Sequence, residues 1–414
     1  MDILVYADWK GLDGPLLMGV LSVVHTKGHE VFSFAYDKGW LDKGSAQGLD
    51  PDLQFYAGSQ YLNAGKKNFG IFLDSSPDRW GRVLMARREA IQARMAGRKE
   101  KTLFEEDYLL GVFDLHRMGA LRFKMEPEGP FLNDNANLTA PPWASMRELE
   151  FASLQLEKDA LNDEESLKWL SMLIAPGASL GGARPKASVI DPSGNLWIAK
   201  FPSVRDGMDI GGWEMVANLL AKKAGLDIAD GDLKKFNSKH HTFLSKRFDR
   251  TKDGSRIHFA SAMTLLGRSD GETGASYLDI AEFIIKQGSN ADRDLEELWR
   301  RIIFGIAIKN TDDHLRNHGF ILHNGGWALS PAYDINPVPH GNGLTLNISA
   351  TDNSLAYDLA RSVAKYFRVD SEKTESIIDK VKTAVTDWQK IAKHFNIPTS
   401  EQDLMAQAFE KKDR

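Results

Sequence analysis

Polar residues gather in the segment IKNTDDHLRNHGF, residues 308–320, between an apolar helical pattern and an apolar strand pattern. Asp312 and Asn317 stand five positions apart in this segment, and Asp334 follows a short hairpin pattern further along the chain. Carboxylate and amide oxygens are ligands that Mg2+ prefers, and a carboxylate beside a hydroxyl group can accept its proton. The three residues therefore predict a site for a metal-bound phosphate group.

The order of these residues is typical of a protein kinase. Kinases place a catalytic aspartate and a metal-binding asparagine five positions apart, then a hairpin, then a second metal-binding aspartate. Lys200 ends a strand pattern and precedes a helix pattern with Glu214, like the lysine and glutamate that hold nucleotide phosphates in kinases. A glycine-rich stretch, residues 177–186, lies where a phosphate-binding loop is expected. This joint order favours phosphoryl transfer from ATP with Mg2+ as cofactor.

Each of these features has an ordinary structural interpretation when it is taken alone. An Asp-rich loop is usually a solvated turn or a helix cap, and a lone lysine or glutamate is usually a surface residue. His314 and His318 beside two aspartates suggest zinc, but the loop offers no matching third ligand. We therefore expect His314 to order the loop and not to bind zinc.

Apolar periodicity predicts the elements that must position these residues. Leucine, isoleucine and tryptophan recur every three or four positions in DLEELWRRIIFGIAIKN, which predicts a buried helix leading into the polar segment. Asn324-Gly325 predicts the turn of the hairpin that follows. A second helix is predicted over GGWEMVANLLAKKAGL, with Gly225 at its C-terminal cap.

The first third of the chain is expected to form a separate unit. Strand patterns in DILVYAD and EVFSFAY precede a long basic helix pattern, for which Ser76 is the expected cap and Pro77 part of the first turn. The basic residues between Arg79 and Lys101 are suited to DNA phosphates, but the apolar residues among them favour a helix with one solvated face. A polar stretch that ends in two prolines, residues 131–143, predicts a linker.

Composition and charge restrict the class of protein. A length of 414 residues predicts two or three domains, and 42% hydrophobic with 26% charged residues is typical of a folded protein. A net charge of -5 gives no general bias towards nucleic acid or anionic membranes. The sequence has no cysteine, which excludes disulfides and thiolate metal sites. Because it shows no membrane-length apolar segment and no signal-like N-terminus, we expect a cytoplasmic protein with no membrane contact.

The chain resembles the HipA serine/threonine kinases of bacterial toxin–antitoxin modules over nearly its whole length. SLGGARPK is similar to the family's phosphate loop, WIAKFP to its lysine strand, LSKRFDR to its hinge, NTDDHLRN to its catalytic loop and LSPAYDINP to its metal-binding segment. SSPDRWGR and GVFDLHRMGALRF resemble the family's N-terminal module. The resemblance implies an α+β fold, two-lobed and protein-kinase-like, with a small β-rich lobe, a larger helical lobe and an N-terminal α/β accessory domain.

Domain bounds follow from the resemblance together with the linker. Residues 1–135 would form the accessory domain and a candidate surface for antitoxin contact. Residues 144–261 would form the small lobe with the phosphate loop and the hinge. Residues 262–414 would form the helical lobe with the catalytic loop and the metal-binding segment.

The resemblance also implies roles for single residues. Asp312 would be the catalytic carboxylate, Asn317 and Asp334 the magnesium ligands, and Ser179 the serine that the enzyme autophosphorylates to switch itself off. Asp313 stands where a glycine is common in the family and is a secondary candidate for base or metal contact. Lys246 stands where the family usually has an acid, so adenine would contact backbone groups of the hinge. The residues expected to bind the nucleotide are Ser179, Gly181, Gly182, Ala183, Lys186, Lys200, Glu214, Lys246, Arg247, Phe248, His314 and Asp334.

Together these inferences predict a kinase that transfers the γ-phosphoryl group of ATP to a protein serine or threonine. By resemblance, its substrate belongs to the translation machinery, with an aminoacyl-tRNA synthetase as the best-known kind of target. Its partner would be a HipB-like helix-turn-helix antitoxin, through which it would contact operator DNA indirectly. Two alternatives stay open, a small-molecule kinase and a non-catalytic nucleotide-binding co-repressor, although the intact set of catalytic residue types argues against the second.

Overall fold

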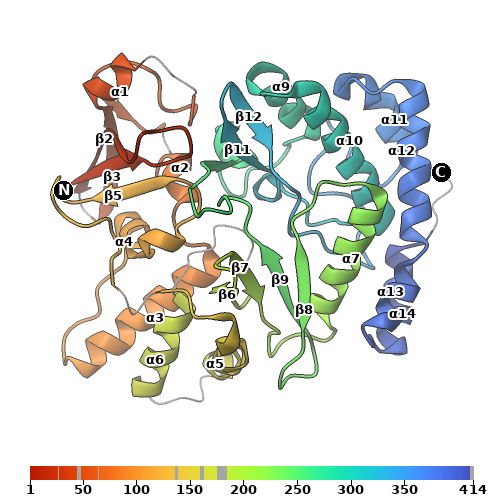
Figure 1. Cartoon of the computed structure of the whole chain (residues 1–414), viewed down its shortest axis with the longest axis horizontal. Helices are drawn as coiled ribbons and strands as arrows, with labels where there is room; N and C mark the ends of the chain where they lie inside the picture. Colours follow the sequence, from red (N-terminus) through yellow and green to blue (C-terminus); the bar gives the residue numbers. More distant parts are fainter. Residues whose placement is uncertain are drawn as a thin grey trace. The chain divides into compact units, whose positions relative to one another are not determined.

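Alternating apolar residues at the N-terminus form an antiparallel sheet (Figure 1). The computed structural model describes residues 1–26, 28–43, 48–63, 65–135, 139–158, 163–174 and 184–410. In β1, Ile3, Val5 and Ala7 are buried, as a period of two requires for a strand with one core face. The strand order is β4-β3-β2-β1-β5, and the bounds are β1 (Asp2–Ala7), β2 (Leu16–Thr26), β3 (His29–Tyr36), β4 (Ser59–Tyr61) and β5 (Leu121–Lys124). The two strands predicted from DILVYAD and EVFSFAY are confirmed.

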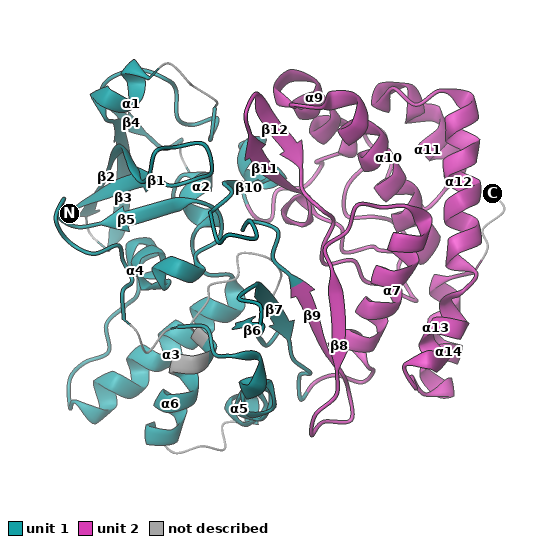
Figure 2. Cartoon of the chain, viewed as in Figure 1, with its two compact units in different colours: residues 1–204, 246–269 teal, residues 205–245, 270–414 magenta. Residues whose placement is uncertain are grey.

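The chain divides into two compact units (Figure 2). Unit 1 is Met1–Val204 with Lys246–Ser269, and unit 2 is Arg205–Ser245 with Asp270–Arg414. These two units do not test the predicted division into domains 1–135, 144–261 and 262–414, which stays a prediction. The other elements of unit 1 are α1 (Lys38–Asp42), α2 (Gly70–Asp74), α3 (Arg79–Met95), α4 (Glu105–Gly111), η1 (Asp114–His116), η3 (Trp143–Ser145), α5 (Met146–Lys158), α6 (Asp163–Ile174), β6 (Lys186–Ile190), β7 (Leu196–Lys200), β10 (Phe259–Ser261) and α8 (Ala262–Leu265).

The cap of the basic helix α3 differs from the prediction. Asp78 is the N-cap residue, and its carboxylate accepts a hydrogen bond from the Gly81 amide at 2.9 Å. Ser76 instead donates its hydroxyl group to the main-chain oxygen of Phe72 at 2.8 Å, at the end of the preceding short helix. Both residues are good caps, and the expected cap was wrong because Ser76 is already used by α2.

The strand β9 (Thr242–Lys246) is followed by a segment of unit 1, residues 247–250, that contains a buried cluster of charged side chains. The Asp249 side chain is fully buried and accepts hydrogen bonds from Arg247 and Arg250 at 2.6 and 2.7 Å and from the Gly119 amide at 2.8 Å. Burial alone would raise the pKa of Asp249, but the two arginines hold it at about 2. This carboxylate therefore stays charged and keeps both guanidinium groups in the interior of unit 1.

Unit 2 is mainly helical, and its two predicted helices are confirmed. Gly225 caps α7 in a left-handed conformation (φ 87), and α10 buries the predicted apolar face, including Leu298, Trp299 and Ile302. Asn324-Gly325 forms the turn between β11 and β12. The bounds are α7 (Ile210–Ala224), β8 (Gly231–Lys234), α9 (Tyr277–Gln287), α10 (Ala291–Ile308), η4 (Leu315–Asn317), β11 (Gly319–His323), β12 (Gly326–Leu329), α11 (Tyr357–Val363), η5 (Ala364–Phe367), α12 (Ser371–Val385), α13 (Trp388–His394), α14 (Thr399–Met405) and η6 (Ala406–Ala408).

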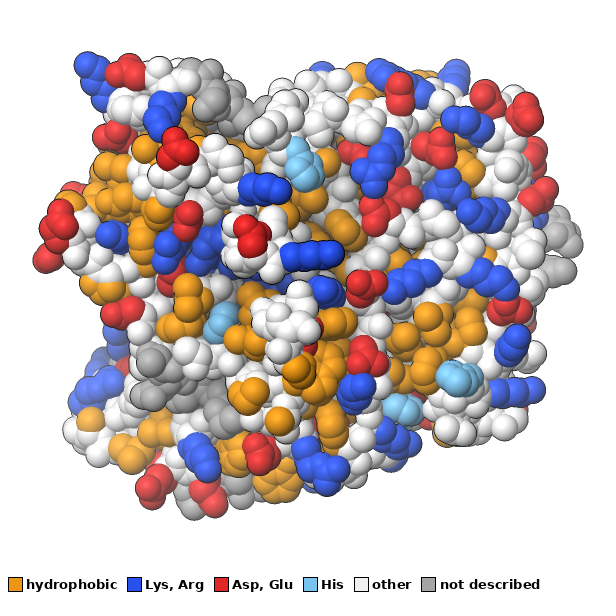
Figure 3. All heavy atoms as spheres, viewed as in Figure 1, with side chains coloured by type: hydrophobic (Ala, Val, Ile, Leu, Met, Phe, Trp, Pro, Cys, Tyr) orange, Lys and Arg blue, Asp and Glu red, His pale blue; other side chains and the backbone are white. Residues whose placement is uncertain are grey.

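The surface carries charges of both signs. Acidic and basic side chains are interspersed on the face drawn in Figure 3, in keeping with the small net charge of -5. Among the residues that the structure describes, no helix has the length and apolar character needed to cross a bilayer.

Candidate active site

The polar segment lies where α10 ends and the β11–β12 hairpin begins, as predicted. Lys309 takes a left-handed conformation (φ 50) at the end of the helix, and the single turn η4 follows. Asn317 Nδ2 donates a hydrogen bond to the main-chain oxygen of Asp312 at 3.1 Å. This bond closes the loop, while the side chain of Asp312 stays exposed. An exposed carboxylate on a closed loop is accessible to a substrate hydroxyl group.

Asn317 has the properties of a metal ligand. Its side chain is buried, and its oxygen Oδ1 has no hydrogen-bond partner in the described part of the chain. Buried polar atoms without a partner are rare in native proteins, and an ion is one common explanation. Because the amide nitrogen is used by Asp312, the amide oxygen remains for a cation such as Mg2+, which favours oxygen ligands.

Main-chain hydrogen bonds tie the segment before Asp334 to the residues that follow α7. The Ala332 amide donates to the Asp227 oxygen at 2.7 Å, and the Ala229 amide donates to the Ala332 oxygen at 3.0 Å. The Tyr333 hydroxyl group donates to the main-chain oxygen of Arg316, in the polar loop after α10, at 2.6 Å. This hydrogen bond, together with that from the Asn336 amide to Asn310 Oδ1 at 3.1 Å, joins the segment around Asp334 to the polar loop after α10.

Asp334 lies in a small pocket of unit 2 with two residues of α7. Glu214 and Asn218, one helical turn apart, line this pocket together with Asp334. Asp334 has a left-handed backbone (φ 57), a conformation in which Asp and Asn are several-fold enriched among non-glycine residues. Asn218 donates to the Ala229 oxygen at 2.9 Å, and its own buried oxygen has no partner among the described residues. The sequence analysis missed Asn218, although its four-residue spacing from Glu214 on a helix was a usable signal.

Asp313 is an interior anchor of the polar loop after α10. It accepts a hydrogen bond from the Tyr277 hydroxyl group, and its carboxylate lies 3.1 Å from His318 Nε2. Burial alone would raise the pKa of Asp313, but His318 and the hydrogen bonds from His318 and Tyr277 hold it below its usual range. Burial and this carboxylate in turn raise the pKa of Tyr277 well above its usual range. These contacts favour an anchoring role for Asp313 over its secondary assignment as base or metal ligand.

The substitution Tyr277→Phe tests this anchor. It removes one hydrogen bond to a buried charged carboxylate, and such bonds stabilise proteins by about 1.5–3 kcal/mol. We expect the free energy of unfolding, measured by urea denaturation, to fall by about that amount. Tyr366→Phe is the matched control, since Tyr366 is 52% exposed, and it should change stability by less than about 0.5 kcal/mol. Equal stability of the two variants would contradict the anchor.

Two lysines predicted to bind phosphates lie directly opposite each other in unit 1. Lys186 of β6 pairs with Lys200 of β7, and directly opposite residues of an antiparallel pair project from the same face. The Lys186 ammonium group is buried and lies 2.6 Å from the Asp78 carboxylate. Lys186 is thus part of a structural ion pair. Its role at the nucleotide, and the predicted pairing of Lys200 with Glu214, stay predictions.

The predicted hinge, Lys246 to Phe248, has contacts of its own within unit 1. The Arg247 amide donates a hydrogen bond to the Leu196 main-chain oxygen at 2.9 Å. The Arg247 guanidinium group donates to the Asp249 carboxylate and to the main-chain oxygen of His116. The Lys246 ammonium group lies 6.0 Å from the centre of the Trp197 ring. Adenine contact by Lys246, Arg247 and Phe248 stays a prediction, and the Arg247 amide is already used by β7.

Several predicted site residues lie outside the described residues. They are the serine, glycines and alanine of the expected phosphate loop, Ser179, Gly181, Gly182 and Ala183. His314, by contrast, is described, and its main-chain oxygen accepts a hydrogen bond from the Asn317 amide at 2.8 Å. Any residue could supply this main-chain oxygen, and His314 Nδ1 is buried without a hydrogen-bond partner among the described residues, so the role of the His314 side chain stays a prediction.

A family model described as "HipA-like C-terminal domain" matches residues 178–388. A protein of Haemophilus influenzae named "Putative kinase" is 31% identical over 188 residues, which cover 39% of this chain and 54% of that protein. A protein of Sinorhizobium fredii named "Putative kinase Y4dM" is 28% identical over 229 residues, covering 50% of this chain and 54% of that protein. The matches therefore span about half the length of these curated relatives.

A solved structure shares the fold over nearly the whole chain. It is the HipA protein of a Shewanella oneidensis MR-1 toxin–antitoxin system, in complex with HipB and its operator DNA. The TM-score is 0.67 at 17% sequence identity, and the match covers 98% of this chain and 96% of that one. The predicted α+β, kinase-like fold is confirmed.

Proposed function

Since this chain belongs to the family defined by the HipA-like C-terminal domain, we propose that it is an ATP-dependent kinase that phosphorylates serine or threonine residues of a protein. The observation that carries the proposal is Asn317, which holds the Asp312 main chain through its amide nitrogen and keeps a buried, unpartnered amide oxygen. The order Asp-x4-Asn is that of the catalytic aspartate and the metal-binding asparagine in a kinase loop. The names of the two curated relatives support a kinase.

Mg2+ fits the oxygen atoms that this site offers. Asn317 and Asp334 would hold the ion, and Glu214 lines the same pocket as Asp334. When bound, Mg2+ would neutralise charge on the phosphates of ATP. Asp312 would accept the proton of the attacking hydroxyl group. The hydroxyl oxygen would form a bond to the γ-phosphorus while the bond between that phosphorus and the leaving oxygen of ADP breaks. An exposed side chain suits this role because the hydroxyl group belongs to a second macromolecule.

Phosphosite mapping tests the proposed function directly. Purified protein is incubated with Mg-ATP and analysed by mass spectrometry, and we expect phosphate on Ser179. A phosphate on this glycine-rich loop adds about -1.5 to -2 charges, which would repel the nucleotide and lower its affinity. Phosphoryl transfer to other proteins without modification of Ser179 would contradict self-inhibition. Failure to bind or hydrolyse ATP at all would contradict the kinase itself.

Lys200 and Lys186 are expected to differ when each is replaced by methionine. Lys200→Met should lower phosphoryl transfer at least tenfold, because we assign Lys200 to the ATP phosphates. Lys186→Met should instead destabilise the protein by about 3–5 kcal/mol, since it leaves Asp78 buried without its ion-pair partner. Kinase assays and thermal denaturation of both variants separate the roles. Retained activity in Lys200→Met would move the phosphate contact to another residue.

The partner we propose is a helix-turn-helix antitoxin of the HipB type, with operator DNA contacted through it. The complex solved for the Shewanella oneidensis protein supports this proposal. We also propose a translation-related substrate such as an aminoacyl-tRNA synthetase, on the family resemblance alone. Co-expression of the chain with the product of an adjacent helix-turn-helix gene should give a complex that survives gel filtration. Separate elution of the two proteins would contradict the partner assignment.

A further inference from the structure

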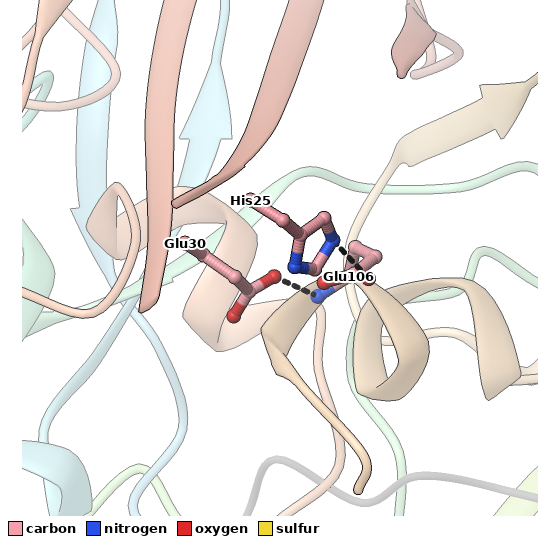
Figure 4. A group of neighbouring side chains, drawn as sticks. All are labelled: His25, Glu30 and Glu106. Atoms are coloured by element: carbon pink, nitrogen blue, oxygen red, sulfur yellow. Dashed lines mark hydrogen bonds and ion pairs between the residues drawn. The ribbon is translucent and has the colours of Figure 1, made fainter. Parts of the chain in front are cut away.

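Three side chains that could bind a cation meet in unit 1, and none of them is a residue of the proposed active site (Figure 4). His25 of β2 and Glu30 of β3 lie directly opposite each other in the sheet, so they project from one face. Glu106 belongs to the first turn of α4. One ligand atom from each residue lies within 4.8 Å of the other two. Sheet and helix thus bring an imidazole and two carboxylates together.

The distances suit a metal ion. His25 Nε2 lies 2.9 Å from Glu106 Oε1. Zinc ligands stand about 2.0–2.2 Å from the ion, so two ligands of a tetrahedral site are about 3.3–3.6 Å apart. A shift of a few tenths of an ångström would therefore admit an ion between these atoms. The Phe104 ring, with its centre 5.1 Å from that of the His25 ring, limits the orientation of the imidazole.

The charges around the cluster are unevenly balanced. Glu105 has a bidentate pair with Arg82, and Asp107 has Lys101 at 2.5 Å. Glu106, by contrast, pairs only with His25, and Glu30 pairs with no basic side chain, among the residues that the structure describes. Two carboxylates therefore share one imidazole in this cluster. A divalent cation would supply the missing positive charge.

Glu106 also has an atom that points to a ligand. The residue is only 6% exposed, and its oxygen Oε2 is buried with no hydrogen-bond partner in the part of the chain that the structure describes. Glu30 uses its oxygens to accept hydrogen bonds from the amides of Glu105 and Glu106 at 2.7 and 3.2 Å. An ionised carboxylate has about four acceptor positions, so Glu30 can hold these amides and a cation together.

We propose that His25, Glu30 and Glu106 bind one Zn2+ ion, with water as the fourth ligand. Mixed imidazole and carboxylate ligands suit zinc, and the half-exposed His25 side chain leaves a path for entry. The ion would join the end of the β2–β3 hairpin to the start of α4. Its ligands come from the two elements that the ion would join, and none of them takes part in the proposed reaction.

The test uses the full chain, stripped with chelator and titrated with ZnCl2 alone. Calorimetry should give one zinc per chain, and zinc should raise the thermal midpoint. His25→Ala and Glu106→Gln should each lower zinc affinity at least tenfold. His29→Ala is the matched control, because His29 is an exposed histidine on the same hairpin and should bind zinc as the wild type does.

Several results would overturn the proposal. Wild-type protein that binds no zinc, or binds it equally well in the His25→Ala and His29→Ala variants, would exclude the site. Binding of Mn2+ in preference to Zn2+ would overturn the choice of metal. If Glu106→Gln does not fold, as circular dichroism would show, the surface variant His25→Ala still decides. The proposed kinase reaction is independent of this result, since zinc binding is measured without ATP.

Discussion

The substitution Asp312→Asn is expected to reduce phosphoryl transfer by about a thousandfold and to leave ATP binding and folding unchanged. A positioned general base contributes about 10²–10⁴ in rate, and asparagine cannot accept the proton. The Asp312 side chain is exposed, and the loop is held by its main-chain oxygen and Asn317, so the fold does not depend on the carboxylate. Phosphate transfer from labelled ATP and calorimetric ATP titration measure the two quantities.

Asp403→Asn is the matched control for this experiment. Asp403 is an exposed aspartate on α14, and its replacement should change neither quantity. A variant at Asp312 that keeps its rate but loses ATP affinity would contradict the assignment and would point to a metal-binding role instead.

Asp334→Asn is expected to weaken magnesium-dependent ATP binding at least tenfold and to abolish turnover. The change removes one negative charge from the metal site but keeps the side-chain shape. Asparagine tolerates the left-handed backbone of Asp334 as well as aspartate does, so the fold should survive. ATP titrations with Mg2+ and with chelator give the measurement. Equal affinity with Mg2+ in variant and wild type would show that Asp334 does not hold the ion.

Local sequence signals predicted the elements that carry the proposed site. The apolar period of α10 and the Asn324-Gly325 turn are short-range features, and each depends on neighbours a few positions away. Because Asp312, Asn317 and Asp334 lie close to the ends of these elements, the predicted elements also gave the approximate positions of these residues in the fold. The predicted cap of α3 was wrong because two good caps, Ser76 and Asp78, stand two positions apart, and the Ser76 hydroxyl group is used by the end of the preceding helix α2.

The supporting contacts could not be predicted, because they join distant positions. Tyr277 reaches Asp313 across 36 positions, and Asp78 reaches Lys186 across 108. No local pattern predicts such pairs. Similarly, the sequence favoured a solvated face of α3 over a DNA contact, but it could not show that Arg82 and Arg94 form ion pairs with Glu105 and Asp163 within unit 1. These pairs favour the interpretation of α3 as a structural helix.

The ion pair of Lys186 and Asp78 makes the β6–β7 hairpin depend on residues near position 80. Trp80 adds a hydrogen bond from Nε1 to the main-chain oxygen of Lys186 at 3.2 Å. The family model starts at residue 178, about a hundred positions after these partners. A fragment cut at that point would bring a strand lysine into its interior without the carboxylate that neutralises it. We therefore expect a fragment that begins at residue 178 to be less stable than the full chain, because the Asp78 carboxylate that pairs with this hairpin lies outside the matched region.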